Sequence, residues 1–399
     1  MNQLVHADVI PDGWVKKPLF DMCRFIPGKA HEPFIDPLGE FTCVNSKFIS
    51  TEGQVAKTCN RSITPAKVND ILMVMSDLPN GRALAKCYLV GEHERLAVNQ
   101  RVCILRPKQG FDAQMLFHIL NRHPYFMAFD DGVNQTHLLN GVFEKCVLAV
   151  PDDPEEQRHL GQALSDADGV VEGLERLIAK KRRIKQGAMQ DLLTAKRRLP
   201  GFSGEWVVKT LQDLCSQIQD GTHFTPTYVD MGIPFYSVEN ITARNFDECK
   251  FVTPEAHAAM AKRCLPKPGD ILMTRIGSIG DTYLVDWNHE ASIYVSLCLL
   301  RPSPSVDALY LYAYSRSSMF VKGVEDRSLP NAIPKKINLG DIADVEVSMP
   351  IDPAEQSAIA FTLNDMDAEI TALEARLHKA RAIKEGMMQN LLTGRTRLV

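Results

Sequence analysis

Few residue patterns in this chain could support catalysis, and each of them is incomplete. The segment RIGSIGD, from Arg275, contains two glycines but lacks the GxGxxG spacing that holds a dinucleotide phosphate, so a tight turn explains it better. Glu248 and Lys250 match the second half of the nuclease pattern PD…ExK, in which acidic residues hold a divalent metal. No Pro-Asp pair lies at a suitable distance before them, and we therefore expect no catalytic residue.

Histidine spacing and the remaining motifs do not predict a metal or cofactor site either. His118 and His123 stand five residues apart in a helical pattern, which is more typical of a surface or core role than of metal ligands. The chain has no HExxH, GxxxxGK[ST] or GxSxG motif. It also lacks the Asn-Pro-Pro-aromatic run with which an adenine methyltransferase grips a flipped base. We expect no metal and no cofactor on this chain.

Polar residues that could address nucleic-acid bases occur in the predicted loops. Arg can hydrogen-bond to guanine, and Asn or Gln to adenine, in the major groove, although the same residue types are common in turns. The candidates are Asn80, Arg82, Gln100, Arg101, Asn134, Gln135 and His137 in the first half of the chain, and His223, Thr225, Asn240, Arg275 and Asn331 in the second.

Positive charge is local, since the whole chain has a net charge of −4. Residues 176–198 contain nine Lys or Arg and one acidic residue, and residues 376–397 contain six and one. A helix C-terminus that favours cations, together with a solvated face, is one interpretation. Contact with phosphates or with a partner protein is the other.

The elements that carry these charges are an internal repeat. A shift of 199 residues aligns PDDPEEQ, from Pro151, with PIDPAEQ, from Pro350, and the match continues without a gap to the end. It includes IKQGAMQDLLTAKRRL, from Ile184, and IKEGMMQNLLTGRTRL, from Ile383. Weaker correspondences precede each copy: NDILM at Asn69 with GDILM at Gly269, and strands that end in ILRP and LLRP.

Periodicity predicts that each copy is one long helix. Apolar residues follow a 4-3-4-3-4 spacing typical of a coiled-coil seam, at Leu160, Leu164, Ala167, Val171, Leu174 and Ile178, and again at Ile359, Leu363, Met366, Ile370, Leu373 and Leu377. Pro154 and Pro353 suit a first helical turn, and Pro200-Gly201 is expected to end the first helix. The other copy is the nearest partner for each seam, which predicts an antiparallel pair. Pairing of each helix with another subunit is the alternative.

The segments between the helices read as short strands with intervening helices, which predicts α+β domains. The expected organisation is a first domain over 1–150, a spacer helix over 151–199, a second domain over 200–349 and a C-terminal helix over 350–399. The two domains would be related by a pseudo-two-fold axis. Nearly identical helices with divergent domains favour a protein that recognises two different targets at a set spacing.

Composition adds a cellular context. The N-terminal sequence has no secretory signal pattern, and no apolar run approaches the ~20 residues that cross a bilayer. A cytoplasmic protein without a membrane partner is therefore expected. The ten cysteines include no CxxC pair, which predicts reduced core residues.

The duplicated helical motifs, each preceded by P-x-D-P-x-E-Q, resemble those of the specificity (S) subunits of type I restriction-modification systems. GDILMTRIGSIGDTYLV and GIPFYSVENI also look like stretches of that family's target recognition domains. The resemblance covers the whole chain. It implies a non-catalytic subunit in which each target recognition domain reads one half of a bipartite double-stranded DNA site.

The resemblance also implies partners. The helices would set the gap between half-sites and dock methyltransferase (M) subunits, and through them restriction/translocase (R) subunits. S-adenosylmethionine, ATP and Mg²⁺ would be bound by those partners. The residues that match the family's spacer motif are Gln157, Lys185, Gly187, Gln190 and Leu193, with Gln356, Lys384, Gly386, Gln389 and Leu392 in the second copy. A degenerate scaffold or inhibitor that binds M subunits without reading DNA is the alternative, and an autonomous endonuclease is a third interpretation.

Overall fold

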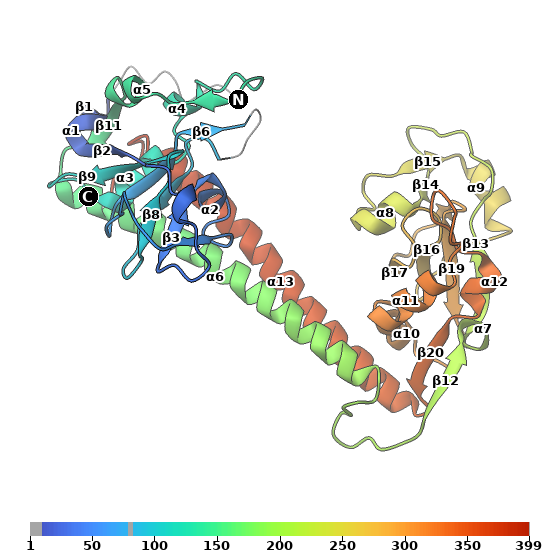
Figure 1. Cartoon of the computed structure of the whole chain (residues 1–399). Coiled ribbons are helices and arrows are strands. Elements are labelled where there is room, and N and C mark those ends of the chain that lie inside the picture. Colours follow the sequence, from blue (N-terminus) through green and yellow to red (C-terminus); the bar gives the residue numbers. More distant parts are fainter. Residues whose placement is uncertain (1–9, 79–82, 399) are drawn as a thin grey trace. The chain divides into compact units, whose positions relative to one another are not determined.

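The computed structural model describes residues 10–78 and 83–398, and the chain divides into two compact units. The first unit runs to Glu175 and also contains the chain from Ala375, and the second runs from Arg176 to Glu374. Each unit thus holds one globular domain and half of each of two long helices, α6 (Pro154–Leu192) and α13 (Pro353–Leu391) (Figure 1). This division differs from the predicted boundaries, which placed each helix in a segment of its own.

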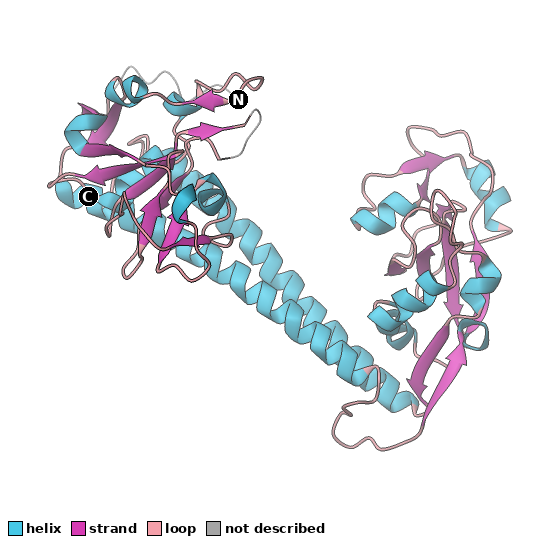
Figure 2. Ribbon diagram, viewed as in Figure 1, coloured by secondary structure: helices cyan, strands magenta, loops and turns pink. Residues whose placement is uncertain are grey.

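The first domain is a mixture of short strands and short helices, as expected for an α+β fold (Figure 2). Its elements are β1 (Trp14–Pro18), α1 (Leu19–Met22), β2 (Cys23–Pro27), the 3-10 helix η1 (Glu32–Phe34), β3 (Phe41–Val44), α2 (Ser46–Ser50), β4 (Lys57–Cys59), β5 (Ile71–Val74), β6 (Ser76–Asp77), β7 (Cys87–Leu89), β8 (Leu96–Val98), β9 (Val102–Pro107), α3 (Ala113–Leu120), α4 (Pro124–Met127), β10 (Thr136–His137), α5 (Asn140–Glu144) and β11 (Val147–Pro151).

The second domain has the same succession with local differences. Its elements are β12 (Trp206–Thr210), α7 (Leu211–Leu214), β13 (Cys215–Asp220), β14 (Ile233–Tyr236), α8 (Val238–Ala243), β15 (Lys250–Val252), α9 (Pro254–Ala261), β16 (Ile271–Thr274), β17 (Thr282–Leu284), β18 (Ser292–Ile293), β19 (Leu297–Pro302), α10 (Ala308–Ser315), α11 (Ser318–Asp326), α12 (Leu339–Ala343) and β20 (Glu346–Pro350).

The strand order shows that both domains follow one plan. A four-stranded sheet has the order β2-β9-β5-β7 in the first domain and β13-β19-β16-β17 in the second. A three-stranded sheet has the order β4-β3-β8 or β15-β14-β18, and its β3–β8 and β14–β18 pairs are parallel. The first and last strands pair as β1-β11 and β12-β20, so each domain ends beside its own start and leads directly into a long helix.

The shared plan requires a glycine at one equivalent position in each domain, where two backbone segments approach closely. Gly28 follows β2 and Gly221 follows β13, at matching places. A Cβ at Gly28 would lie 2.1 Å from the Asn99 carbonyl oxygen, and one at Gly221 would lie 2.0 Å from the Ile293 carbonyl oxygen. Only a residue without a side chain allows this approach of the two backbones.

An Asp–Arg pair accounts for the weak sequence correspondences between the domains. The Asp of NDILM, Asp70, is buried and accepts two hydrogen bonds from Arg106 of ILRP, at 2.7 and 2.8 Å. The Asp of GDILM, Asp270, is bound in the same way by Arg301 of LLRP, at 2.9 and 2.7 Å. A buried carboxylate requires a charged, hydrogen-bonding partner, which explains why both motifs appear in both domains.

The predicted helical seams are confirmed. All twelve seam positions are buried or half-buried, and Leu164 and Leu363 are 0% and 2% exposed. Both helices begin at the predicted prolines. The expected end at Pro200-Gly201 was wrong, because α6 stops at Leu192. The backbone turns away at Ala195 with a φ of 56°, and its equivalent Gly394 has a φ of 66°.

Each domain's core is completed by both helices. In the first unit, Leu160 and Leu164 of α6 and Leu391 of α13 belong to the same apolar cluster as the domain's own strands and helices. In the second unit, Leu193 of the first repeat copy and Ile359 of α13 do the same. The C-terminal end of each long helix therefore packs into the core of the domain that the other helix leaves.

Equivalent ion pairs join the two helices in each unit. The second repeat copy supplies the basic residues in the first unit, and the first copy supplies them in the second unit. Three pairs occur in both units: Arg397–Glu156, Lys384–Asp168 and Arg381–Glu175 in the first, and Arg198–Glu355, Lys185–Asp367 and Arg182–Glu374 in the second. The second unit has a further pair, Lys181–Glu369. In the three shared pairs, partner numbers fall on one helix as they rise on the other, so the helix segments in each unit are antiparallel. This confirms the predicted pairing of the two copies.

In each unit, the most buried carboxylate of these pairs is the one near the start of a long helix, Glu156 or Glu355. Glu156 is 2% exposed, and Arg397 donates to both of its carboxylate oxygens, at 2.9 and 2.5 Å. Glu355 is fully buried, and Arg198 binds it at 2.5 and 2.6 Å. The hydrogen bonds from Arg397 lower the pKa of Glu156 against the opposing effect of burial, so the carboxylate stays charged.

Removal of Arg397 should therefore destabilise the first unit more than its position near the chain end suggests. Arg397→Ala leaves the Glu156 carboxylate buried and unpaired, and we expect a loss of about 3–5 kcal/mol in the free energy of unfolding. Arg395→Ala, which removes an exposed arginine two residues away, is the control. Urea titration followed by circular dichroism measures both. A loss below about 1 kcal/mol for Arg397→Ala would contradict the argument.

The first unit should also lose stability in mild acid. Burial lowers the pKa of His118 to about 4, and burial lowers that of His123 to about 4 as well. Unfolded imidazoles take up a proton near pH 6.5 and the folded ones only near pH 4, so the free energy of unfolding falls as the pH drops through this window. His118→Asn should reduce the slope, measured as melting temperature against pH between 7 and 4. An unchanged slope would exclude His118 as the cause.

Candidate nucleic-acid interface

The structure separates the first-half candidates by their side-chain partners. Gln100 and Arg101 are exposed beside the carboxyl end of β8. Asn134 and Gln135 are exposed, but Asn134 donates to Asp131 at 2.9 Å and Gln135 donates to Ser76 at 3.0 Å. His137 is exposed on β10. Two further candidates, Asn80 and Arg82, lie outside the described residues.

Two of the second-half candidates are structural, which corrects the prediction. Asn240 is 7% exposed; its amide oxygen accepts from the Ser237 backbone, and its nitrogen donates to the carbonyls of Asn245 and Glu248. Arg275 is 5% exposed and donates to Asp220 at 2.9 Å. Loop-forming sequence suggested exposed side chains, but tertiary packing turned both inward.

The other second-half candidates remain exposed. His223, Thr225 and Asn331 all present side chains to solvent. The His223 Nε2 lies 2.8 Å from the buried Asp220 carboxylate, which also accepts from Arg263 at 2.5 Å. Burial opposes ionisation of Asp220, but hydrogen bonds from Arg263 and His223 lower its pKa. One buried carboxylate thus holds several basic side chains at the surface next to Thr225.

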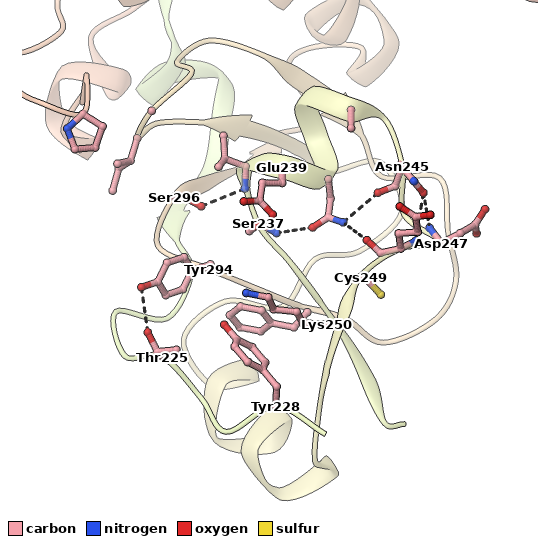
Figure 3. A pocket seen from close by; sticks show the side chains of 18 residues that line it. Thr225, Tyr228, Ser237, Glu239, Asn245, Asp247, Cys249, Lys250, Tyr294 and Ser296 are labelled. Atoms are coloured by element: carbon pink, nitrogen blue, oxygen red, sulfur yellow. Dashed lines mark hydrogen bonds between the residues drawn. The ribbon is translucent and has the colours of Figure 1, made fainter. Parts of the chain in front are cut away.

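A cleft of about 890 Å³ in the second domain has two of the second-half candidates, Thr225 and the buried Asn240, in its lining, and sequence analysis did not foresee it (Figure 3). It lies at the carboxyl end of the parallel strands β14 and β18, where α8 begins. Thr225 lies at its rim with its hydroxyl 3.3 Å from that of Tyr294. The lining also includes Tyr228, Phe235, Ser237, Glu239, Asn245, Asp247, Glu248, Lys250, Ile276 and Ser296.

Aromatic rings and a lysine form one wall of this cleft. The Tyr228 ring lies 5.7 Å from that of Phe235, which lies 5.9 Å from that of Tyr294. The Lys250 ammonium is 4.6 Å from the centre of the Tyr228 ring, within the range of a cation–π interaction. Figure 3 shows Lys250 beside Tyr228, with Ser237 and Glu239 at the start of α8. Such a wall offers stacking surfaces and hydrogen-bonding groups together.

The first domain has a cleft in the same topological place. It measures about 470 Å³ and lies at the carboxyl end of the parallel strands β3 and β8, where α2 begins. Its lining includes the candidate Arg101, together with Glu32, Asn45, Lys47, Asp77 and Asn99. Asn45 caps α2 by accepting from the Phe48 backbone at 2.9 Å. Only the structure reveals this site, because the parallel pairing of β3 with β8 is what places the loops after both strands at one sheet edge.

Most of the predicted partner-binding residues on the helices have partners within the chain. Gln157 is buried, accepts from the Asp112 backbone at 3.1 Å and donates to the Pro151 carbonyl at 2.9 Å. Gln356 repeats this with Asp307 and Pro350. These two glutamines fasten each domain to its own helix, and we correct their assignment to partner binding.

The rest of the spacer motif divides between interior and surface. Leu193 is fully buried, Leu392 is half-buried, and Lys185 and Lys384 take part in the ion pairs described above. Gly187, Gln190 and Gln389 are exposed, and Gly386 is half-buried. A Cβ at either glycine would meet no atom within 4 Å. The surface around both glycines is therefore open for a partner, and docking there stays a prediction.

The basic segments are also explained mainly within the chain. The nine basic residues over 176–198 include Lys181, Arg182, Lys185, Lys196 and Arg198, each of which forms an ion pair. Lys196 pairs with Asp191 of its own helix and the other four with acidic residues of α13. The helix-pairing chemistry accounts for much of the local positive charge.

Residues 10–78 and 83–398 contain no group of three or more His, Cys, Asp or Glu side chains that could hold a metal ion. In the same ranges, none of the helices combines the length and hydrophobicity of a bilayer-crossing segment. All ten cysteines are free thiols and eight are buried, as predicted, with burial raising the pKa of Cys23 to about 12.

The chain consists of two divergent domains of one plan, each joined to a repeated long helix. The family described as "Type I restriction modification DNA specificity domain" matches residues 203–380. The type I restriction enzyme MjaVIII specificity subunit of Methanocaldococcus jannaschii is 21% identical over 99% of this chain and 95% of its own length. Residues 203–380 thus match that family's model, and the chain over nearly its whole length is similar to a type I restriction enzyme specificity subunit.

One further relative is similar in sequence, and two solved structures are similar in fold. The putative MjaX specificity subunit of the same organism is 26% identical over 47% of this chain and 46% of its own length. The crystal structure of a type I S subunit from M. genitalium has a TM-score of 0.67 at 14% identity, with 98% of both chains covered. A structure from work on complex assembly of a type I system has a TM-score of 0.54 at 17% identity, covering 96% of this chain and 98% of the other.

The buried role of Asn240 can be tested directly. Asn240→Ala removes the donor to the carbonyls of Asn245 and Glu248 and the acceptor for Ser237, and we expect a loss of about 2 kcal/mol in the stability of the second domain. Asn331→Ala, at an exposed loop position, should change stability by less than about 0.5 kcal/mol. Chemical unfolding measures both, and equal effects would contradict the structural role.

Proposed function

We propose that this chain is the DNA-recognition subunit of a type I restriction-modification complex, and that each domain reads one half of a bipartite double-stranded DNA target. The supporting observation is the pair of clefts at the same place in two domains of one plan, with different residues in each. A shared scaffold with different linings fits two different half-sites. Polar side chains held by a rigid sheet edge are the groups that read base edges in a groove.

The helices are proposed to set the unspecified gap between the half-sites and to dock methyltransferase subunits. The duplicated ion pairs support the first role, because they fix the register of two antiparallel helices. The open surface at Gly187 and Gly386 supports the second. The restriction/translocase subunits would then join through the methyltransferase subunits.

We propose no catalytic role for this chain itself. Methylation, DNA translocation and cleavage would belong to the partner subunits, which would bind S-adenosylmethionine, ATP and Mg²⁺. Purified chain without partners should leave DNA uncut over excess Mg²⁺. Cutting by the isolated chain would support an autonomous endonuclease instead.

A matched lengthening of both helices tests the spacing role. One heptad would be inserted after Ile178 and one after its repeat equivalent, Leu377. Each insertion lies between residues of the Arg182–Glu374 and Arg381–Glu175 ion pairs, so a matched insertion in both helices preserves the seam and both ion pairs. Seven residues add about 10 Å, and the gap in the target should grow by about three base pairs with both half-sites unchanged. Methylome sequencing of a host that expresses the variant with methyltransferase subunits measures this. An unchanged gap would reject the spacing role.

Exchange of the first domain for that of another specificity subunit should change one half-site only. The junction belongs at Pro151, because β11 ends there and Gln157 fastens the domain to α6. If the wild-type chain binds methyltransferase subunits but the complex methylates no defined sequence, the degenerate scaffold replaces the proposed function.

A further inference from the structure

The two clefts carry opposite charge at one equivalent position. Asn45 caps α2 and Ser237 caps α8, each directly after the strand that pairs in parallel. Two residues further along, the first domain has Lys47 and the second has Glu239. Both side chains are exposed and both line their cleft. One backbone position thus presents an ammonium in one domain and a carboxylate in the other.

In the cleft of the first domain, the acidic side chains accept hydrogen bonds from neighbouring residues, whereas the basic side chains are exposed. Asp77 accepts from the backbone of Ala83 at 2.7 Å. Glu32 accepts from the Asn99 side chain at 2.9 Å, and this hydrogen bond lowers the pKa of Glu32. Lys47 and Arg101 form no ion pair with any residue in the described part of the chain. This cleft therefore offers hydrogen-bond donors to a ligand.

In the second domain the balance is reversed. Glu239 and Asp247 line the cleft, and neither carboxylate forms an ion pair within residues 10–78 and 83–398. Lys250 is the cation of this cleft, and its ammonium lies over the Tyr228 ring. This cleft therefore offers carboxylate acceptors, with Glu239 at the position of Lys47.

Base edges in the major groove also divide into those that accept hydrogen bonds and those that donate them. Guanine presents two acceptors, O6 and N7, whereas cytosine and adenine present exocyclic amino groups that donate. A carboxylate beside DNA is repelled by phosphates, and its interaction becomes favourable only where it accepts from such an amino group. Lysine and arginine suit guanine, while glutamate suits an amino base.

We propose that the two domains select chemically opposite base edges: Lys47 and Arg101 select guanine in one half-site, and Glu239 selects the amino group of cytosine or adenine in the other. This inference rests on the proposed function. It assigns each domain to a half-site by the hydrogen-bonding groups of the bases, and it gives a role to the opposite charges of Lys47 and Glu239.

The experiment uses the full chain assembled with methyltransferase subunits and a duplex DNA library in which every position is random. Lys47→Ala should lower the preference for guanine about tenfold at one position of one half-site, and Glu239→Ala should lower the preference for an amino base about tenfold in the other half-site. Lys16→Ala on β1 and Glu346→Ala on β20, which alter exposed charges outside the clefts, should leave the selected sequence unchanged.

A charge reversal provides a gain of function that loss of folding cannot imitate. Glu239→Lys should replace the amino base with guanine at the same position, and the selected base in the wild type distinguishes cytosine from adenine. A bipartite site that persists unchanged in Glu239→Ala and Glu239→Lys would overturn the inference while leaving the proposed function intact, as would effects of Lys47 and Glu239 on the same half-site. A wild-type complex that selects no sequence would overturn both.

Discussion

The architecture depends on a buried carboxylate near the start of each long helix that is neutralised by an arginine near the end of the other copy. Glu156 and Glu355 are 2% and 0% exposed, and each accepts two hydrogen bonds from one guanidinium. An unpaired charge in such a place would cost several kcal/mol. The helix end that supplies the arginine also supplies leucines to the same core. The core of the first domain is complete only when Leu391 packs into it from the distant C-terminal helix, and the core of the second domain requires residues of both repeat copies, such as Leu193 and Ile359.

This constraint explains why the helices repeat closely while the domains differ. Three interhelical pairs exist in two versions, so the two units require the same residue types at equivalent positions of the two helices. The domains also share duplicated framework contacts, such as those of Gln157 and Gln356 and the Asp70–Arg106 and Asp270–Arg301 pairs. Their cleft residues are free to vary, and Lys47 and Glu239 show that even charge can invert on a conserved backbone. For a protein proposed to read two half-sites, this separates the fixed spacing from the variable recognition.

Several sequence signals were real but had a different meaning from the one first assigned. The basic segments after Arg176 and Arg376 were candidates for phosphate or partner contact, and many of their charges instead pair with acids of the other helix. The parallels at NDILM and ILRP reflect a buried Asp–Arg pair. Asn240 and Arg275 were predicted in loops, yet caps and buried ion pairs use the same residue types as base recognition. Residue type alone cannot separate these roles, because the chemistry of the hydrogen bond is the same.

The sequence by itself determined the duplicated helices, their seams, their starting prolines and the α+β character of both domains. These features follow from local periodicity and from a repeat that can be read without knowing any contact. Only the tertiary structure decided that α13 ends in the core of the first domain and α6 in the core of the second, since this depends on packing contacts and not on local periodicity. It also decided which polar side chains reach solvent and where the clefts lie, because burial is a property of the assembled fold and not of a residue's neighbours in sequence.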